Sequence, residues 1–253
     1  MRAELFKVPV DILTIDETVG LVESAVRTRG RLQHVALNVA KLVSLQNNDE
    51  LREDVASSDI VGVDGMGIAL ALRFLGHKNV GRVSGVDLMM KILAFCAMNN
   101  HRPFFLGATE EIMLGAVAVS KQKFPGLQFA GFENGYFNSE EEAKVMGRIA
   151  KSGADCLFIG MPTPRKERLL KKWRDELNIP FIMGVGGSFD VLAGKVQRAP
   201  LWMQTYGLEW TYRIYQEPGR MWWRYLSTNT RFLGMLAQLI SLRLFALRRF
   251  FGG

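Results

Sequence analysis

The chain is poor in the side chains that covalent and metal-dependent catalysis require. Its 253 residues include two cysteines and three histidines, and the histidines are scattered without the spacing of metal ligands. It has no D-x-D carboxylate pair of the kind that holds a metal against a diphosphate, and no serine nucleophile elbow. These absences leave acid–base and electrostatic chemistry, and we expect no metal site, no cofactor and no covalent intermediate.

Other absences concern the cellular setting. Cys96 and Cys156 lie in apolar contexts, which predicts reduced core residues of a cytoplasmic protein. The N-terminus lacks the basic start, long apolar run and small-residue cleavage site of a signal peptide. No run of 18 uninterrupted apolar residues occurs, so we expect no transmembrane helix.

Positive charge is concentrated at the C-terminal end. Residues 213–253 contain seven arginines, no lysine and one acidic residue, Glu217, so they hold most of the formal net charge of +7. Basic residues among many aromatics favour an anionic membrane surface or phosphate groups as partners. Nucleic acid fits less well, because the same segment is strongly apolar.

Short apolar runs alternate with helical patterns over residues 1–198. Seven runs are predicted strands: Val8–Ile15, Leu32–Asn38, Asp59–Val63, Pro103–Gly107, Leu127–Phe132, Asp155–Gly160 and Pro180–Val185. Helical patterns between them include Glu17–Arg29, Val86–Met98, Glu110–Phe124, Glu140–Lys151 and Lys166–Leu177. Several strands are continuously apolar, as in sheets that are covered on both faces. We therefore predict an α/β body with a mostly parallel sheet and helices on both faces.

Residues 199–253 form a predicted C-terminal appendage of helical pieces. Four of the five tryptophans lie in it, and Asn229 to Arg249 has helical periodicity with one broad apolar face. Two interpretations stay open for this helix. It packs on the body or on another subunit, or it lies in a membrane interface as an amphipathic helix.

Candidate site residues follow from the position of the strand ends. In parallel α/β sheets, ligands bind beyond the carboxyl ends of the strands. The residues at those ends are Asn38, Asp64, Gly107, Gly160 and Gly184–Gly187.

Asp64 and Arg82 are the strongest chemical candidates. Asp64 follows an apolar strand and precedes Gly65 and Gly67, where it can act as a general base or cap a helix. Arg82 follows at a distance suited to the same pocket, as a phosphate ligand or as a member of a surface ion pair. Asp87 is equally compatible with a helix cap.

Glycine turns and a proline-rich loop offer sites for an anion. Gly107 opens one strand–helix junction, and Gly184, Gly186 and Gly187 form another; such junctions present N–H groups to phosphate or serve only as turns. Neither is a full G-x-G-x-x-G motif. The loop at residues 161–167 carries two cations, one of them Lys166, that can face an anionic ligand.

The motifs together resemble a known family. Asn38, the VDGMG block at 63–67, RVSGVDL at 82–88, Gly-Tyr-Phe at 135–137 and GVGGSFDVLAGKVQRAPLWMQTYGLEWTYR at 184–213 occur in the order typical of the WecG/TagA/CpsF glycosyltransferases, also called glycosyltransferase family 26. The resemblance covers essentially the whole chain and implies a Rossmann-like body of the GT-E type. It implies an inverting, metal-independent transfer of a sugar from a UDP-sugar to a polyprenyl-diphosphate-linked saccharide, in exopolysaccharide or cell-envelope synthesis at the inner face of the cell membrane.

The same resemblance assigns roles to individual residues. Asp64 matches the proposed base, and Asn38 and Arg82 match pocket positions. Three tail residues match arginines thought to hold the lipid diphosphate: Arg213, Arg220 and Arg224. A homo-oligomer is compatible with this pattern.

Two departures from the family pattern concern specificity. Ala36 replaces a frequent threonine, and Lys166 replaces a glutamine in the A-P-K-Q-E loop. The resulting TPRKE form is more similar to exopolysaccharide glucosyltransferases of the GumM type, so the donor is of the UDP-glucose or the UDP-N-acetylmannosamine type. A nucleotide-binding oxidoreductase and a non-catalytic scaffold of a polysaccharide assembly complex are the alternatives.

Overall fold

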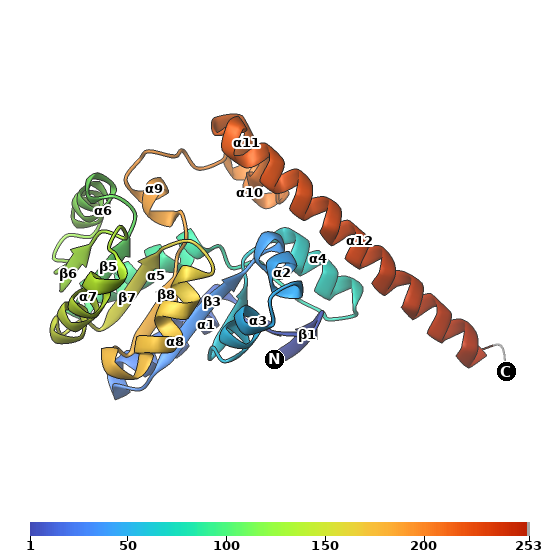
Figure 1. The fold of residues 1–253 in the computed structure, drawn as a ribbon, viewed down its shortest axis with the longest axis horizontal. Coiled ribbons are helices and arrows are strands. Elements are labelled where there is room, and N and C mark those ends of the chain that lie inside the picture. The colour runs from blue at the N-terminus through green and yellow to red at the C-terminus, as the bar shows by residue number, and fades with distance from the viewer. Residues whose placement is uncertain (252–253) are drawn as a thin grey trace.

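The computed structural model describes residues 1–251, with the side chains of Arg220 and of residues 242–251 outside that description. An eight-stranded sheet in the order β1-β2-β4-β3-β8-β7-β5-β6 forms its centre (Figure 1). All strand pairs are parallel except β1 with β2, so the predicted α/β fold with a mostly parallel sheet is confirmed. The strands are β1 (Arg2–Leu5), β2 (Val8–Asp11), β3 (Leu32–Leu37), β4 (Ile60–Val63), β5 (Pro103–Gly107), β6 (Gly131–Glu133), β7 (Cys156–Gly160) and β8 (Phe181–Gly184).

Helices cover both faces of this sheet. On one face lie α1 (Ile15–Thr28), α5 (Gly85–Met98), α6 (Glu110–Lys123) and the short α9 (Ser188–Leu192). On the other lie α2 (Val39–Gln46), α3 (Asp49–Ala56), α7 (Ser139–Lys151) and α8 (Arg165–Leu177), and α4 (Met66–Phe74) adds to the core beneath α2 and α3.

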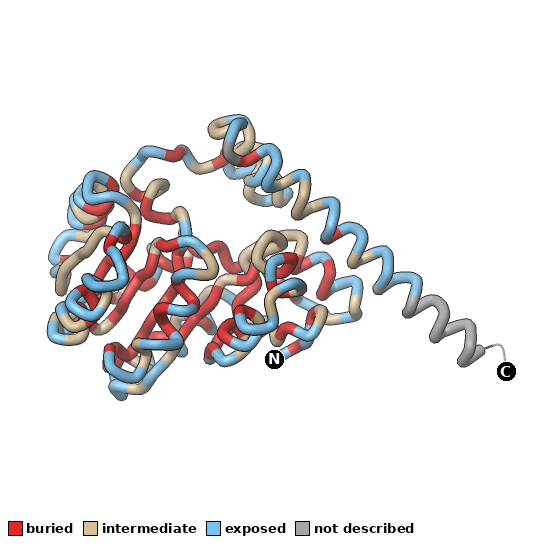
Figure 2. Tube along the Cα trace, in the orientation of Figure 1, coloured by how far each residue is buried: buried red, intermediate tan, exposed pale blue. Residues whose placement is uncertain are grey.

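The period-two geometry of the strands separates the two layers of core. Phe181 and Met183 of β8 pack under α1, α5 and α6, whereas Ile182 between them packs under α7 and α8. Because every second residue enters each core, a central strand is apolar over most of its length, although β3 also buries Gln33 and His34. Strands β4, β5 and β8 are accordingly buried from end to end, and β3 and β7 are buried over most of their length (Figure 2).

Two predicted strands differ from the structure. The run Val8–Ile15 ends as a strand at Asp11, because Thr14 caps α1 in a capping box with Glu17. The run Leu127–Phe132 is mostly loop, and the strand there is β6, at Gly131–Glu133. The antiparallel edge strand β1 was not predicted.

Three helices follow the body: α10 (Leu201–Thr205), α11 (Glu209–Gln216) and α12 (Pro218–Phe251). Helix α12 packs on α2 and then runs beyond the body (Figure 1). Phe232 is buried in the α2/α4 core, with Met235 and Leu236 packed against it, while Leu233 and Ile240 are exposed. The helix therefore packs on the body along one side and leaves apolar residues open on another. In the described part of the chain, no helix has the length and apolar character needed to cross a membrane.

Candidate active site

Asp64 lies at the carboxyl edge of the sheet, directly after β4. Its N–H donates to the Leu37 carbonyl at 3.0 Å, which joins the ends of β4 and β3. Its Oδ1 accepts the N–H of Gly85, the first residue of α5, at 3.0 Å. The N-cap of the following helix α4 is Gly65, so Asp64 does not cap its own helix. A carboxylate held between two elements and still partly exposed is placed to meet a ligand.

The surroundings of Asp64 change its affinity for a proton. Burial raises the pKa of this carboxyl above its ordinary value, and the negative Glu209 adds to the rise. Hydrogen bonds from Gly85 and Asn38 and the positive charge of Arg82 oppose it. A carboxylate whose proton affinity is raised is better suited to general-base work than an exposed one.

Asn38 connects Asp64 to the start of α2. It is the N-cap of that helix, and its side-chain oxygen accepts the Lys41 N–H at 3.0 Å. The amide side chain also interacts with the Asp64 carboxylate. The predicted pocket position of Asn38 thus lies beside the proposed base.

Arg82 is engaged by the C-terminal appendage. Its Nη2 lies 2.5 Å from Oε2 of Glu209 in α11, and Nη1 donates to the Gln204 carbonyl at 3.4 Å. The structure thus shows Arg82 in an ion pair, and its contact with a phosphate stays a prediction.

A second ion pair lies beside the first. Arg198 binds both carboxylate oxygens of Asp87 at 2.5 Å, and its Nε lies 3.8 Å from Oε1 of Glu209. Ser84, not Asp87, is the N-cap of α5. Four alternating charges therefore connect the body to α11 next to Asp64.

A cavity of about 540 Å³ adjoins Arg82. It is lined by Thr14, Ile15, Gly81, Arg82, Val83, Ser84, Asp87, Met90 and Lys91. Its wall includes the residues on either side of Arg82 and the cap of α5, so it opens beside the loop that binds Asp64.

Two of the three predicted tail arginines lie at the same edge. An added Cβ on Gly187 would lie 3.3 Å from Nη1 of Arg213, so this arginine reaches the glycine turn after β8. The pKa of the Tyr225 hydroxyl is raised, mainly by burial. It is lowered by the charges of Arg213 and Arg224 and raised by those of Asp64 and Glu209, so these four side chains lie near it. Neither Arg213 nor Arg224 forms an ion pair with a described residue. The side chain of Arg220 lies outside the described residues.

Lys166 is buried under the site. Its stem crosses Gly184, where an added Cβ would lie 2.7 Å from the lysine Cε, and its ammonium lies 3.1 Å from Glu167. Burial and the nearby Lys41 lower the Lys166 pKa to about 8. Direct contact of Lys166 with a ligand stays a prediction, since its side chain is closed off from solvent.

The predicted glycines Gly107 and Gly186 have different structural roles. Gly107 has φ +136°, and an added Cβ would lie 2.6 Å from the backbone of Gly160, so close strand packing demands glycine there. Strands β8 and β7 separate β5 from β3, and Gly107 is therefore not brought together with Asp64. Gly186 has φ +54° with open space around it, which leaves room for a ligand near Gly187.

The Gly-Tyr-Phe segment and the proline-rich loop, far apart in sequence, meet in the fold. Arg165 donates to the carbonyls of Gly135 at 2.9 Å and Phe137 at 2.6 Å, and its guanidinium lies 4.7 Å from the centre of the Phe137 ring. Arg165 thereby fixes the start of α8, the helix that carries Lys166.

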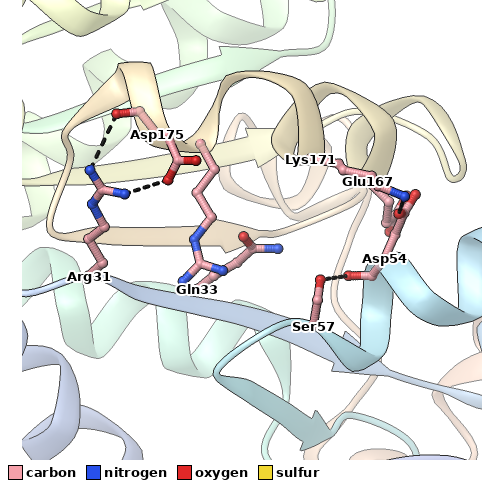
Figure 3. A pocket seen from close by; sticks show the side chains of 8 residues that line it. Arg31, Gln33, Asp54, Ser57, Glu167, Lys171 and Asp175 are labelled. Carbon is pink, nitrogen blue, oxygen red and sulfur yellow. Dashed lines mark hydrogen bonds and ion pairs between the residues drawn. The ribbon is translucent and has the colours of Figure 1, made fainter.

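A second cavity, of about 330 Å³, lies between α3 and α8 (Figure 3). It is lined by Arg31, Gln33, Asp54, Ser57, Glu167, Lys171, Arg174 and Asp175. Its charged side chains mostly pair with one another, as Arg31 does with Asp175 and Lys171 with Asp54. None of the predicted site residues lines it. Among the described residues, no three histidine, cysteine or acidic side chains are grouped as metal ligands.

Comparison with known proteins decides the family. The profile of the WecG/TagA/CpsF glycosyl transferase family matches residues 3–244. The chain belongs to this family. The match extends from β1 into α12, so it includes Asp64, Arg82 and the tail arginines.

Two curated relatives agree with the assignment. Both are named N-acetylglucosaminyldiphosphoundecaprenol N-acetyl-beta-D-mannosaminyltransferase, one from Bacillus spizizenii at 34% identity and one from Bacillus subtilis at 31%. Each alignment covers 68% of this chain and 66% of the relative. Membership in a glycosyl transferase family disfavours the oxidoreductase and scaffold alternatives.

Several residues of the site escaped the sequence analysis. Glu209, Arg198 and Tyr225 lie beside Asp64 and Arg82 only because the appendage folds back over the sheet edge. The Gly85 N–H carries no sequence signal, because a backbone donor looks the same at every position.

Proposed function

We propose that this WecG/TagA/CpsF family member is an inverting glycosyltransferase that uses a UDP-sugar and a polyprenyl-diphosphate-linked saccharide. The observation that carries this is Asp64: a carboxylate with raised pKa at the sheet edge, held by Gly85 and Asn38 and flanked by arginines from two parts of the chain. In this mechanism Asp64 removes a proton from the acceptor hydroxyl as that oxygen attacks the anomeric carbon, and UDP leaves from the opposite side.

The arginines and N–H groups supply the electrostatic part. A leaving diphosphate gains negative charge in the transition state, and fixed cations and backbone donors at its oxygens stabilise it. Arg82 and the glycine turn at Gly184–Gly187 serve the donor. Arg213 and Arg224, which have no ion pair with a described residue, serve the acceptor diphosphate together with Arg220.

The acceptor assignment rests on the relatives and on the appendage. The relatives are named for an undecaprenyl-diphosphate-linked acceptor. Here, exposed Trp222 and Trp223 directly precede Arg224 on α12, which suits an amphiphilic ligand at an anionic membrane surface. We accordingly place the enzyme at the inner face of the cell membrane.

The donor sugar divides into two candidates. The relatives transfer N-acetylmannosamine, whereas Lys166 in the TPRKE loop favours a glucose donor of the GumM type. Transfer from a panel of UDP-sugars, including UDP-glucose and UDP-N-acetylmannosamine, to lipid-linked acceptors separates them. Purified protein that transfers none of these sugars contradicts the proposed function.

The reaction is proposed to need no metal. Activity should survive EDTA at millimolar excess, because arginines and N–H groups replace the cation. Complete loss under EDTA, with recovery in Mg²⁺ or Mn²⁺, contradicts this part of the proposal.

A further inference from the structure

The guanidinium assigned to the donor phosphate already binds a carboxylate of the same chain. Arg82 is 11% exposed and Glu209 30% exposed, and their charged atoms lie 2.5 Å apart. A pair this sheltered from water is stronger than an ordinary surface ion pair. Carboxylates and phosphates bind the guanidinium fork through the same N–H groups. A phosphate that binds Arg82 therefore competes directly with Glu209.

A second partner for Glu209 lies within reach. Its other oxygen, Oε1, is 3.8 Å from Nε of Arg198, whose two terminal nitrogens are held by Asp87. The Arg198 Nε is thus oriented toward Glu209 while its remaining donors are fixed. Glu209 therefore has a second cation nearby when it releases Arg82.

We propose that Glu209 is a positioning residue that acts as an internal competitor for the diphosphate of a nucleoside-diphosphate donor at Arg82. Donor binding transfers Glu209 from Arg82 to Arg198. The inference rests on the proposed function, because it takes Arg82 as the donor-phosphate ligand. It adds that the appendage, through Glu209, lowers the affinity of Arg82 for the donor diphosphate.

The exchange also reaches the base. Glu209 raises the pKa of Asp64, and Arg82 lowers it. When Glu209 turns toward Arg198 and a phosphate takes its place on Arg82, the anionic charge beside Asp64 stays but now belongs to the substrate. Burial raises the Asp64 pKa whether or not Glu209 is in place, and an anion on Arg82 adds a smaller contribution in the same direction.

The test measures the binding of UDP and of inorganic pyrophosphate by titration calorimetry. Glu209→Gln removes the competing charge and keeps the shape, so both ligands should bind about three- to tenfold more tightly than to the wild type. Arg82→Met should lose most of the binding. In the double variant, Glu209→Gln should give no further gain, since the competition needs Arg82. The matched control is Glu176→Gln, an exposed glutamate in the last turns of α8, which should bind UDP as the wild type does.

Two results overturn the inference. One is unchanged or weaker binding in Glu209→Gln; the other is equal tightening in the Arg82→Met background, which marks a general charge effect. Should Glu209→Gln fail to fold, judged by circular dichroism and melting, Glu209→Asp keeps the charge but shortens its reach and should still tighten binding. A wild type that transfers sugar while Glu209 variants bind UDP no more tightly contradicts this inference alone. A wild type that neither binds UDP nor transfers sugar contradicts the proposed function as well.

Discussion

At the scale of single residues, the surroundings of Asp64 favour the role of base that we propose for it. Burial raises the Asp64 pKa, and hydrogen bonds from the Gly85 N–H and the Asn38 amide orient the carboxylate. The sequence placed Asp64 at a strand end but left a helix cap equally open. The structure excludes a cap of α4, because Gly65 is the N-cap of that helix, and the role of Asp64 as a base stays a prediction.

The substitution Asp64→Asn tests the role directly. It keeps the shape but cannot accept a proton, so the transfer rate should fall by roughly 10²–10⁴-fold. UDP affinity should change little, because Asp64 serves the acceptor. Steady-state kinetics and UDP titration check both, with the exposed Asp175→Asn as a control that keeps wild-type activity. A near-wild-type rate in Asp64→Asn means that the carboxylate only ties β4 to α5.

The pH dependence follows from the direction of the pKa shift. Only the deprotonated Asp64 acts as a base, and its pKa in the folded protein is raised. Activity should therefore be lost, as the pH falls, at a higher pH than an ordinary aspartate with a pKa of about 3.9 would give. Asn38→Ala removes a hydrogen bond that lowers the pKa, so the acidic limb of kcat/KM should move to still higher pH. If Asn38→Ala lowers the rate without moving that limb, Asn38 only caps α2.

The sequence at the start of α7 contains two overlapping capping-box patterns. Ser139 followed by Glu142 has the spacing of a capping box, but Asn138 and Glu141 form the one in the structure. Both pairs fit the pattern one position apart. Asparagine and serine are about equally good caps, so the backbone entering α7 decides between them.

At the scale of elements, a buried charge cluster joins α2 to α8. Lys41 lies 2.9 Å and Lys166 3.1 Å from the same oxygen of Glu167, and the other oxygen has no hydrogen-bond partner. Although burial alone would raise the Glu167 pKa, the two lysines lower it to about 2. Because Lys41 is in the turn capped by Asn38, the cluster holds the helix end that touches Asp64.

Glu167→Gln should destabilise the fold strongly. It leaves two buried ammonium groups without a counter-charge, and breaking a buried pair in this way costs about 3–5 kcal/mol. Urea unfolding measures the loss. The matched variant Lys166→Gln should cost less, because Glu167 keeps Lys41. Equal losses in both variants, or none in Glu167→Gln, would show that the cluster does not hold α2 against α8.

The strands were predictable, but this cluster was not. Most central strands are apolar along their length because both faces are covered, and that pattern is visible in a single sequence. Lys41 and Glu167 are 126 positions apart, and nothing local marks them as partners. The edge strand β1 was missed for a related reason, since a short strand of mixed burial has little of the apolar signal.

At the scale of the whole molecule, the appendage does two things with one chain. Helix α11 returns to the sheet edge with Glu209 and Arg213, and the first turns of α12 bring Tyr225 to the same region near Asp64. The last helix docks through Phe232 and then leaves the body (Figure 1). Composition predicted a separate basic and aromatic end, yet it could not place that end over the site, because the placement depends on tertiary contacts.

The C-terminal end of α12 gives the last prediction. Deleting residues 240–253 removes three arginines and no acidic residue, while Phe232, Met235 and Leu236 stay packed on the body. Binding to vesicles with anionic lipid should weaken, most clearly at low salt, because each arginine near such a surface contributes about 1 kcal/mol. Melting temperature should change little. Phe232→Ala reverses the pattern: it should cost about 3–5 kcal/mol of stability by opening a cavity, but retain vesicle binding. Sedimentation with vesicles measures membrane binding of both variants, and thermal melting measures their stability. Full vesicle binding by the shortened chain would show that the end of α12 is not the membrane contact.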